Sequence, residues 1–520
     1  MKRSEMIQSV KDMSGRWWDI IIIGGGATGL GAAVDASSRG YKTLLLEKAD
    51  FAKGTSSRST KLIHGGVRYL QQGNVSLVLE SLKERGLLIK NAPHLVCNQS
   101  FVVPYYKWWE GPYYWLGLRI YDILAGELGL GPSKYLSSKK AQARIPTLIS
   151  SGLRGGVMYY DGQFDDSRLA INLAKSSAKE GGVLINYMKV TGLLKASGKI
   201  RGVKAEDMLN GEEYEIKGRA VINATGVFTD AILKMDDPET SSIITPSQGI
   251  HIVIDKRFLP GDTAIMIPKT RDGRILFALP WYNKVMLGTT DTPVQQINAE
   301  PEAMESEIEF LLKHAAEYLT EKPDPSDVRS VFAGLRPLVT NSRAGNTAAI
   351  SRDHTVTVSP AGLVTITGGK WTTYRKMAED VVNRALDVAG LPSGECITES
   401  LRIHGWTDET DKKDPLHYYG TDKAEVMNII DINPELGRRL HERLPYVKAE
   451  VIWAVRNEMA MTVEDFSSRR TRALFLDAKA SVEIAPEVAR LMAEEAGHGD
   501  GWIKNQVKAY SALASNYQIL

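Results

Sequence analysis

The sequence predicts an α/β protein in which a Rossmann-type dinucleotide-binding domain carries a β-rich substrate cap and is followed by a C-terminal helical domain. Three observations support this prediction. A strand, glycine turn and helix pattern covers residues 19–47, β-rich runs recur within 95–160 and 245–330, and charged segments rich in Ala and Leu dominate beyond residue 390. The 520 residues exceed one ordinary core, so we expect two or three domains.

The composition narrows the functional class. With 43% hydrophobic and 24% charged residues, the chain is typical of a globular protein with a substantial core. Lys plus Arg number 64 against 62 Asp plus Glu, so we expect no nucleic-acid partner. Cys97 and Cys396 form no CxxC or Cys/His cluster, so we expect no disulfide and no metal site. No apolar run is long enough to span a bilayer, and the N-terminus lacks the layout of a signal peptide.

The first element is a strand, turn, helix and strand unit. Ile20–Ile23 is β-branched, Gly24–Gly26 interrupts the run, Leu30–Ser38 has helical spacing, and Tyr41–Glu47 supplies a second strand. This order is typical of the unit that binds the pyrophosphate of a dinucleotide.

The turn matches the GxGxxG pattern. Its first glycine permits the tight turn, the second lets the backbone approach pyrophosphate, and the third lets the helix pack on the strand. A carboxylate at the end of the second strand can bind the ribose hydroxyls of adenosine. The alternative is an incidental turn followed by a surface glutamate. We expect cofactor contacts from Gly24, Gly26, Thr28, Gly29 and Glu47.

Two further glycine sites favour FAD over NAD, because a nicotinamide enzyme needs neither. Asn223–Gly226 closes a strand, and Gly368–Lys370 lies between a strand and a helix that starts near Thr372. The N-terminus of that helix could stabilise negative charge on a reduced flavin, although taken alone this turn is equally compatible with a simple helix entry. We expect further FAD contacts from Val190, Gly226, Gly369, Lys370 and Thr372.

The cofactor domain is expected to be discontinuous. Strand patterns return at Val183–Val190, Ala220–Ala224 and Leu363–Thr367, the last before a helix that extends to about Leu386. Runs such as Gly249–Ile254 and Ile275–Leu279 indicate an antiparallel sheet in the cap. We assign 17–95, 161–245 and 331–390 to the FAD-binding domain, 96–160 and 246–330 to the cap, and 391–520 to the helical domain.

Three longer motifs carry a family resemblance. They are TSSRSTKLIHGGVRY at Thr55–Tyr69, GLRP at Gly334–Pro337 and GGKWTTYR at Gly368–Arg375. With them, residues 17–390 resemble the FAD-dependent glycerol-3-phosphate dehydrogenases. The resemblance implies non-covalent FAD, glycerol 3-phosphate as substrate, dihydroxyacetone phosphate as product and electron delivery to membrane quinone. It also places five residues beside the flavin: Thr55, Ser56, Leu62, His64 and Gly65. A structural histidine bonded to backbone is an equal alternative for His64.

The substrate of that family needs a cationic site for its phosphate. Guanidinium is suited to this because its planar fork makes bidentate bonds with phosphate oxygens. We expect Arg68, Arg336 and Lys370 to provide the charge, with Tyr69 as a neutral donor. A single Arg is more often a solvated surface charge, and we prefer the ligand role for these residues because they lie in the motifs that carry the family resemblance.

The reaction also needs a base for the C2 hydroxyl proton. His251 is our candidate, because imidazole exchanges a proton near neutral pH and its strand belongs to the cap. A core or backbone-bonded histidine is equally compatible with the sequence. Arg336 could instead orient the hydroxyl and stabilise developing oxyanion charge.

An aromatic segment at 105–121 mixes Tyr and Trp with a few cations, as at lipid–water boundaries. We expect peripheral attachment to the inner, cytoplasmic face of the cell membrane. The alternatives are a core-filling segment and a substrate lid.

Three other functions are compatible with the sequence. They are a glycerol-3-phosphate oxidase that uses O2, an amine or amino-acid oxidase, and a catalytically silent flavin-binding scaffold. The oligomeric state is left open, with a homodimer as one possibility.

Overall fold

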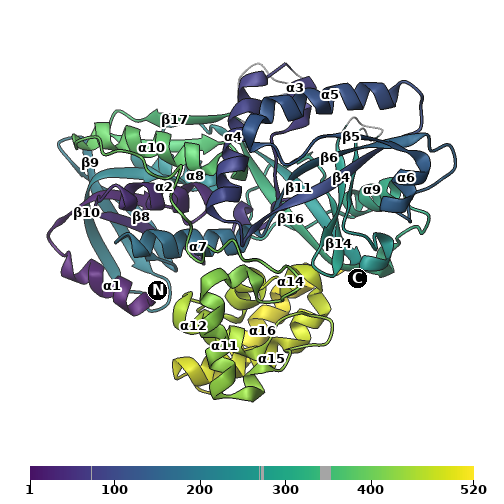
Figure 1. Ribbon diagram of the computed structural model, residues 1–520. Helices are drawn as coiled ribbons and strands as arrows, with labels where there is room; N and C mark the ends of the chain where they lie inside the picture. Colours follow the sequence, from purple (N-terminus) through teal and green to yellow (C-terminus); the bar gives the residue numbers. More distant parts are fainter. Residues whose placement is uncertain (72, 269, 271–273, 340–352, 520) are drawn as a thin grey trace.

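The computed structural model describes residues 1–71, 73–268, 270, 274–339 and 353–519, apart from the side chains of residues 68 and 71. It contains two β-sheets that lie side by side and a separate body of C-terminal helices below them in the view of Figure 1. This arrangement agrees with the predicted fold class.

The first sheet is built on the predicted nucleotide-binding unit. Strand β1 (Trp17–Ile23) is followed by α2 (Ala27–Ser38) and β2 (Thr43–Leu46), and β1 pairs in parallel with β2 and with β10 (Glu213–Asn223). The four isoleucines of β1 are buried, as expected for a strand covered on both faces. Helix α2 packs between α7 (Asp166–Lys179) and α10 (Tyr374–Ala389), which complete one covering layer.

The rest of the first sheet comes from distant segments. Residues 183–190, which the sequence analysis treats as one strand pattern, form two strands because Tyr187 between them has a φ of 55°. The sheet runs in the order β17-β18-β10-β1-β2-β7, β9 pairs with β10, and β8 pairs with β9. Its remaining strands are β7 (Val183–Ile185), β8 (Met188–Ala196), β9 (Lys199–Asp207), β17 (His354–Val358) and β18 (Leu363–Gly368).

The second sheet is antiparallel apart from the pairing of β4 with β12. Strand β16 pairs with β11 along its length, which places residues 331–339 in this sheet, whereas the sequence analysis assigned them to the cofactor domain. The domain limits themselves stay predictions. The strands are β3 (Leu62–Ile63), β4 (Val96–Tyr105), β5 (Lys134–Ser137), β6 (Gly155–Phe164), β11 (Ile244–Asp255), β12 (Ala264–Ile267), β13 (Leu276–Trp281), β14 (Lys284–Gly288), β15 (Thr292–Pro293) and β16 (Val328–Val339).

Helices cover the sheets and form the C-terminal body. Within the described ranges, no helix is long and apolar enough to cross a membrane. The helices around the sheets are α1 (Arg3–Asp12), α3 (Val67–Gln71), α4 (Val75–Asn91), α5 (Glu110–Ala125), α6 (Ser138–Arg144), α8 (Thr229–Asp236) and α9 (Glu305–Ala316). Those of the body are α11 (Lys423–Ile432), α12 (Lys448–Asn457), α13 (Val463–Asp465), α14 (Ala473–Leu476), α15 (Ala478–Ala496) and α16 (Asp500–Ser515).

Buried arginines join the C-terminal body to the first sheet. Arg470 donates to both oxygens of Asp50, at 2.6 and 2.8 Å, and these charges lower the pKa of Asp50 despite its burial. Arg472 donates to the backbone oxygen of Ser57 at 2.6 Å. Because each guanidinium is paired with several acceptors, burying these charges is compatible with a stable interface.

Candidate active site

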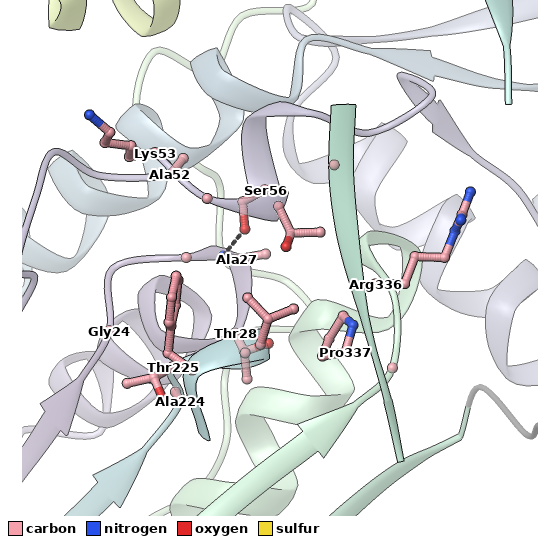
Figure 2. A pocket seen from close by; sticks show the side chains of 18 of the residues that line it. Gly24, Ala27, Thr28, Ala52, Lys53, Ser56, Ala224, Thr225, Arg336 and Pro337 are labelled. Carbon is pink, nitrogen blue, oxygen red and sulfur yellow. Dashed lines mark hydrogen bonds between the residues drawn. The ribbon is translucent and has the colours of Figure 1, made fainter. Parts of the chain in front are cut away.

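A cavity of about 480 Å³ opens where the two sheets meet. It begins at the glycine turn after β1, passes the turns that follow β10 and β18, and ends at β11 and β16 of the second sheet. Figure 2 shows Gly24 and Thr28 of the glycine turn on one side of this cavity and Arg336 and Pro337 of β16 on the other. The cavity therefore connects the nucleotide-binding unit with the predicted cap.

Close backbone contacts fix the glycine turn. Gly24 has a φ of 108°, and a Cβ at Gly29 would lie 1.9 Å from the backbone oxygen of Gly24. Gly26 caps α2 without a side chain, and the backbone N–H of Ala27 donates to Ser56 Oγ at 2.9 Å (Figure 2). The first turn of α2 thus presents its positive dipole end to the cavity, which suits an anion.

Glu47 lies at the end of β2 beside this turn. Its carboxylate accepts the backbone N–H of Gly25 at 2.6 Å and of Ala49 at 2.9 Å. Burial raises the pKa of Glu47, and these two hydrogen bonds oppose the rise. Each carboxylate oxygen has a second lone pair, so the group can still accept from a ribose hydroxyl.

The loop before β3 joins the cavity to the second sheet. Thr55 Oγ1 donates to the backbone oxygen of Leu335 at 2.6 Å, and Trp371 Nε1 donates to the backbone oxygen of Ser56 at 2.8 Å. The backbone N–H of His64 donates to Thr372 Oγ1 at 3.2 Å. Segments 280 to 315 residues apart in the sequence are thereby held together around one cavity.

His251 is buried in β11, with 2% of its surface exposed. Its ring stacks on Phe332, with centroids 5.0 Å apart, and its Nε2 lies 2.9 Å from Thr60 Oγ1. Burial lowers the pKa of His251 well below its usual value, and the positive charges of Lys61 and Arg336 lower it further. The lowered pKa favours the unprotonated imidazole, and the same surroundings oppose its protonation.

Arg336 is held firmly on β16. Its Nη1 donates to Gln248 O and Asp291 Oδ1, both at 3.2 Å, and its Nη2 donates to Thr289 Oγ1 at 3.2 Å and Thr290 O at 2.9 Å. Because both terminal nitrogens already donate to protein atoms, this arrangement favours a fixed cation over a bidentate phosphate clamp. It is the second of the two roles considered for Arg336.

Lys370 and Tyr69 come together from different motifs. The ammonium of Lys370 lies 4.9 Å from the centroid of the Tyr69 ring, and Lys370 lines the cavity. The side chain of Arg68 lies outside the described residues. The structure therefore brings His251, Arg336 and Lys370 to one cavity, with Tyr69 against Lys370.

Most of the predicted cofactor residues line the same cavity. Gly29 and Gly65 are not among the lining residues, and both are closely packed: a Cβ at Gly65 would lie 2.6 Å from Tyr121 Oη. Sequence reasoning missed Thr60, which lies inside a quoted motif but has no spacing signal of its own. The predicted cofactor residues lining the cavity are Gly24, Gly26, Thr28, Glu47, Thr55, Ser56, Leu62, His64, Val190, Gly226, Gly369, Lys370 and Thr372.

Comparison with known proteins decides the family. Residues 19–375 match the family described as FAD dependent oxidoreductase, and residues 363–502 match the C-terminal domain of alpha-glycerophosphate oxidase. The chain is 42% identical over 518 residues to the mitochondrial glycerol-3-phosphate dehydrogenase of Macaca fascicularis, an alignment covering 93% of this chain and 71% of the relative. The chain belongs to the FAD-dependent glycerol-3-phosphate dehydrogenase family. Its Caenorhabditis elegans relative, a probable mitochondrial glycerol-3-phosphate dehydrogenase, is 41% identical over 93% of this chain and 71% of its own length.

Solved structures agree with this assignment. The glycerol-3-phosphate dehydrogenase from Bacillus halodurans, complexed with FAD, is 28% identical, covers 99% of this chain and 98% of its own, and has a TM-score of 0.81. The L-alpha-glycerophosphate oxidase from Mycoplasma pneumoniae, with FAD bound, covers 75% of this chain and 100% of its own at 17% identity and a TM-score of 0.58, which shows a shared fold. The predictions of family, fold class and an FAD cofactor are thereby confirmed.

The residues around the cavity fit FAD. The glycine turn is too closely packed to accept side chains, and it brings the N-terminus of α2, with its positive dipole end, to the cavity. The cavity extends from there to Lys370 and to Arg336 of the second sheet, as an extended dinucleotide next to an anionic substrate requires.

Proposed function

We propose that this protein oxidises sn-glycerol 3-phosphate at C2 to dihydroxyacetone phosphate. The observation that carries the proposal is that His251, Arg336 and Lys370 line the same cavity as the glycine turn. A neutral acceptor for a proton and two cations thus lie where a small phosphorylated alcohol could sit beside the cofactor.

Each side chain has a role in the reaction that follows from its chemistry. Lys370, with Tyr69 against it, binds the phosphate of the substrate. Arg336 acts as a fixed cation that orients the C2 oxygen and stabilises the negative charge that develops on it. His251 accepts the proton of the C2 hydroxyl, and its lowered pKa keeps the ring unprotonated before that step. When bound, FAD supplies the two-electron acceptor for hydride.

Several residues of this chain would hold that cofactor. The N-terminus of α2 would bind the pyrophosphate, and Glu47 would bind the ribose of adenosine. The loop from Thr55 to His64 and the turn from Gly369 to Thr372 would line the flavin, because both border the cavity near His251.

Anaerobic addition of glycerol 3-phosphate tests the function. We expect the visible absorbance of the bound flavin to bleach, because oxidation of the substrate reduces the flavin and no O2 is present to reoxidise it. A His251→Asn variant should keep its flavin spectrum and lose most of its bleaching rate, by about 100-fold or more. A wild-type flavin that stays oxidised would contradict the activity and favour a silent scaffold, and near-normal bleaching by the variant would remove His251 from the reaction.

The alternative electron acceptor is O2. It merits a test because residues 363–502 match a domain named for an alpha-glycerophosphate oxidase. We favour a membrane quinone, as the family resemblance implies. Oxygen consumption measured with and without a soluble quinone analogue distinguishes the two: a dehydrogenase turns over slowly with O2 alone and speeds up with the quinone, whereas an oxidase does not need it.

Attachment to a membrane surface is part of this proposal. Helix α5 exposes an apolar stripe at 113, 116, 120 and 123, with Leu116 and Ile123 exposed by 58% and 72%. Trp108, just before the helix, is 73% exposed. Such a helix can lie in the lipid–water interface and bring the enzyme to its quinone on the cytoplasmic face of the cell membrane.

A further inference from the structure

The hydroxyl of Thr60 lies 2.9 Å from Nε2 of the His251 imidazole. Thr60 is half-buried and lines the cavity, on the loop between Ser57 and β3. The sequence analysis assigns Thr60 no role in binding the cofactor or the substrate or in catalysis. It contacts the one side chain to which the proposed reaction gives the proton.

Packing alone limits how the imidazole can lie. One face stacks on Phe332, with an angle of 17° between the rings. Gly288 faces the ring so closely that a Cβ there would lie 2.1 Å from His251 Cδ2. These apolar contacts hold the plane of the ring, but they offer no hydrogen bond to either nitrogen.

The two nitrogens of the ring differ in their partners. Nδ1 is buried and has no hydrogen-bond partner among the residues that the structure describes. Nε2 has the Thr60 hydroxyl, which can either donate to the neutral ring or accept from the protonated one. Thr60 is therefore the polar contact that distinguishes Nε2 from Nδ1.

The surroundings make a protonated His251 costly. The charged groups that face it are Lys61, next to Thr60, and Arg336 on β16, and both repel an imidazolium. Their charges are partly balanced by Asp166, 2.6 Å from Lys61, and by Asp291, 3.2 Å from Arg336. A hydroxyl oxygen that accepts from Nε2–H offsets part of this cost, because hydrogen bonds to charged groups are the stronger ones.

We propose that Thr60 is a positioning residue for His251, which fixes the imidazole through Nε2 and accepts a hydrogen bond from that nitrogen once the ring has taken the proton of the substrate. This rests on the proposed function, in which His251 is the base. In the step, the O–H and C2–H bonds of the substrate break and a C2=O bond forms. The hydroxyl proton forms an N–H bond on His251, and FAD, when bound, would take the hydride from C2 and be reduced by two electrons. Thr60 loses and gains no proton overall.

The test compares Thr60→Val, which removes the hydroxyl, with Thr60→Ser, which keeps it, in the FAD-loaded enzyme. We expect Thr60→Val to lower kcat by about 10- to 100-fold with little change in KM, and to move the acidic limb of the pH profile to lower pH. Thr60→Ser should restore both. Thr357→Val, an exposed threonine of β17, serves as a matched control and should behave as wild type.

Two further measurements distinguish loss of the hydrogen bond to His251 from a general loss of folded structure. In protein labelled with ¹⁵N-histidine, the His251 signals are those lost in His251→Asn, and Thr60→Val should shift them while Thr60→Ser leaves them in place. In a His251→Asn background, Thr60→Val should slow flavin bleaching no further. An unchanged pH profile and unshifted signals in Thr60→Val would overturn the proposal, as would a failure of Thr60→Ser to restore activity. If wild type does not bleach, or if His251→Asn bleaches normally, the proposed function fails instead.

Discussion

Gly29 lies where α2 packs closely on the turn after β1, so that a side-chain methyl group at this position would prevent the approach. A Cβ there would sit 1.9 Å from the backbone oxygen of Gly24, and backbone cannot move aside as a flexible side chain can. We expect Gly29→Ala to displace the start of α2 from the cavity, destabilise the fold by about 1–3 kcal/mol and weaken FAD retention. The measurement is the ratio of flavin to protein absorbance after gel filtration.

Gly501 provides the matched control for this change. It lies in α16, and a Cβ there would meet nothing within 4 Å. Gly501→Ala should keep a full complement of flavin and should not lose stability, because alanine favours a helix. Full flavin retention by Gly29→Ala would show that the turn tolerates more displacement than its geometry indicates.

At the scale of elements, α5 carries most of the segment for which the sequence leaves membrane attachment, a substrate lid and a core-filling role as alternatives. Its outward stripe is too exposed to be core, and α4 adds two exposed apolar residues, Val75 and Leu79. We expect the double change Leu116→Ser and Ile123→Ser to weaken co-sedimentation with anionic phospholipid vesicles by about 10-fold or more, because less apolar surface enters the interface. Flavin bleaching in solution should not change.

Ile432 offers the control for α5. It is 77% exposed, like Ile123, but it lies in α11 of the C-terminal body, on the opposite side of the molecule from α5 (Figure 1). Ile432→Ser should leave vesicle binding unchanged. Equal loss of binding in both variants would mean that general hydrophobicity, and not the α5 stripe, drives attachment.

At the scale of the whole molecule, stability should depend on pH through His94. Its Nε2 lies 3.1 Å from Asn172 Nδ2 of α7, and burial lowers its pKa to about 4, from an ordinary value of 6.5. The unfolded chain binds a proton between these values and the folded chain does not. The free energy of unfolding should therefore fall as pH drops from 6.5 toward 4, by up to about 3 kcal/mol. Urea unfolding at several pH values measures this.

A His94→Gln variant should flatten that dependence, since glutamine does not titrate. The exposed His498 gives the comparison, because His498→Gln should keep the slope of the wild type. A slope that persists in His94→Gln would assign the acid sensitivity to other groups.

The sequence could predict those features that depend on local pattern. The glycines of the first turn and the spacing of apolar residues in β1 and α2 are such features, and from them the site for the FAD pyrophosphate could be predicted. The break at Tyr187 has no local signal, because a non-glycine residue with positive φ is uncommon. The pairing of β16 with β11 and the contact of Thr60 with His251 join residues far apart in the chain, so only the folded structure reveals them.

The bond from Arg472 to the backbone of Ser57 has a consequence for the order in which the protein can become active. The loop that carries Ser57 borders the cavity, yet its partner is made more than 400 residues later. A nascent chain still attached to the ribosome at its C-terminal end can form β1 and α2 but cannot complete this contact. This contact beside the cavity can therefore form only after the C-terminal body has left the ribosome and docked.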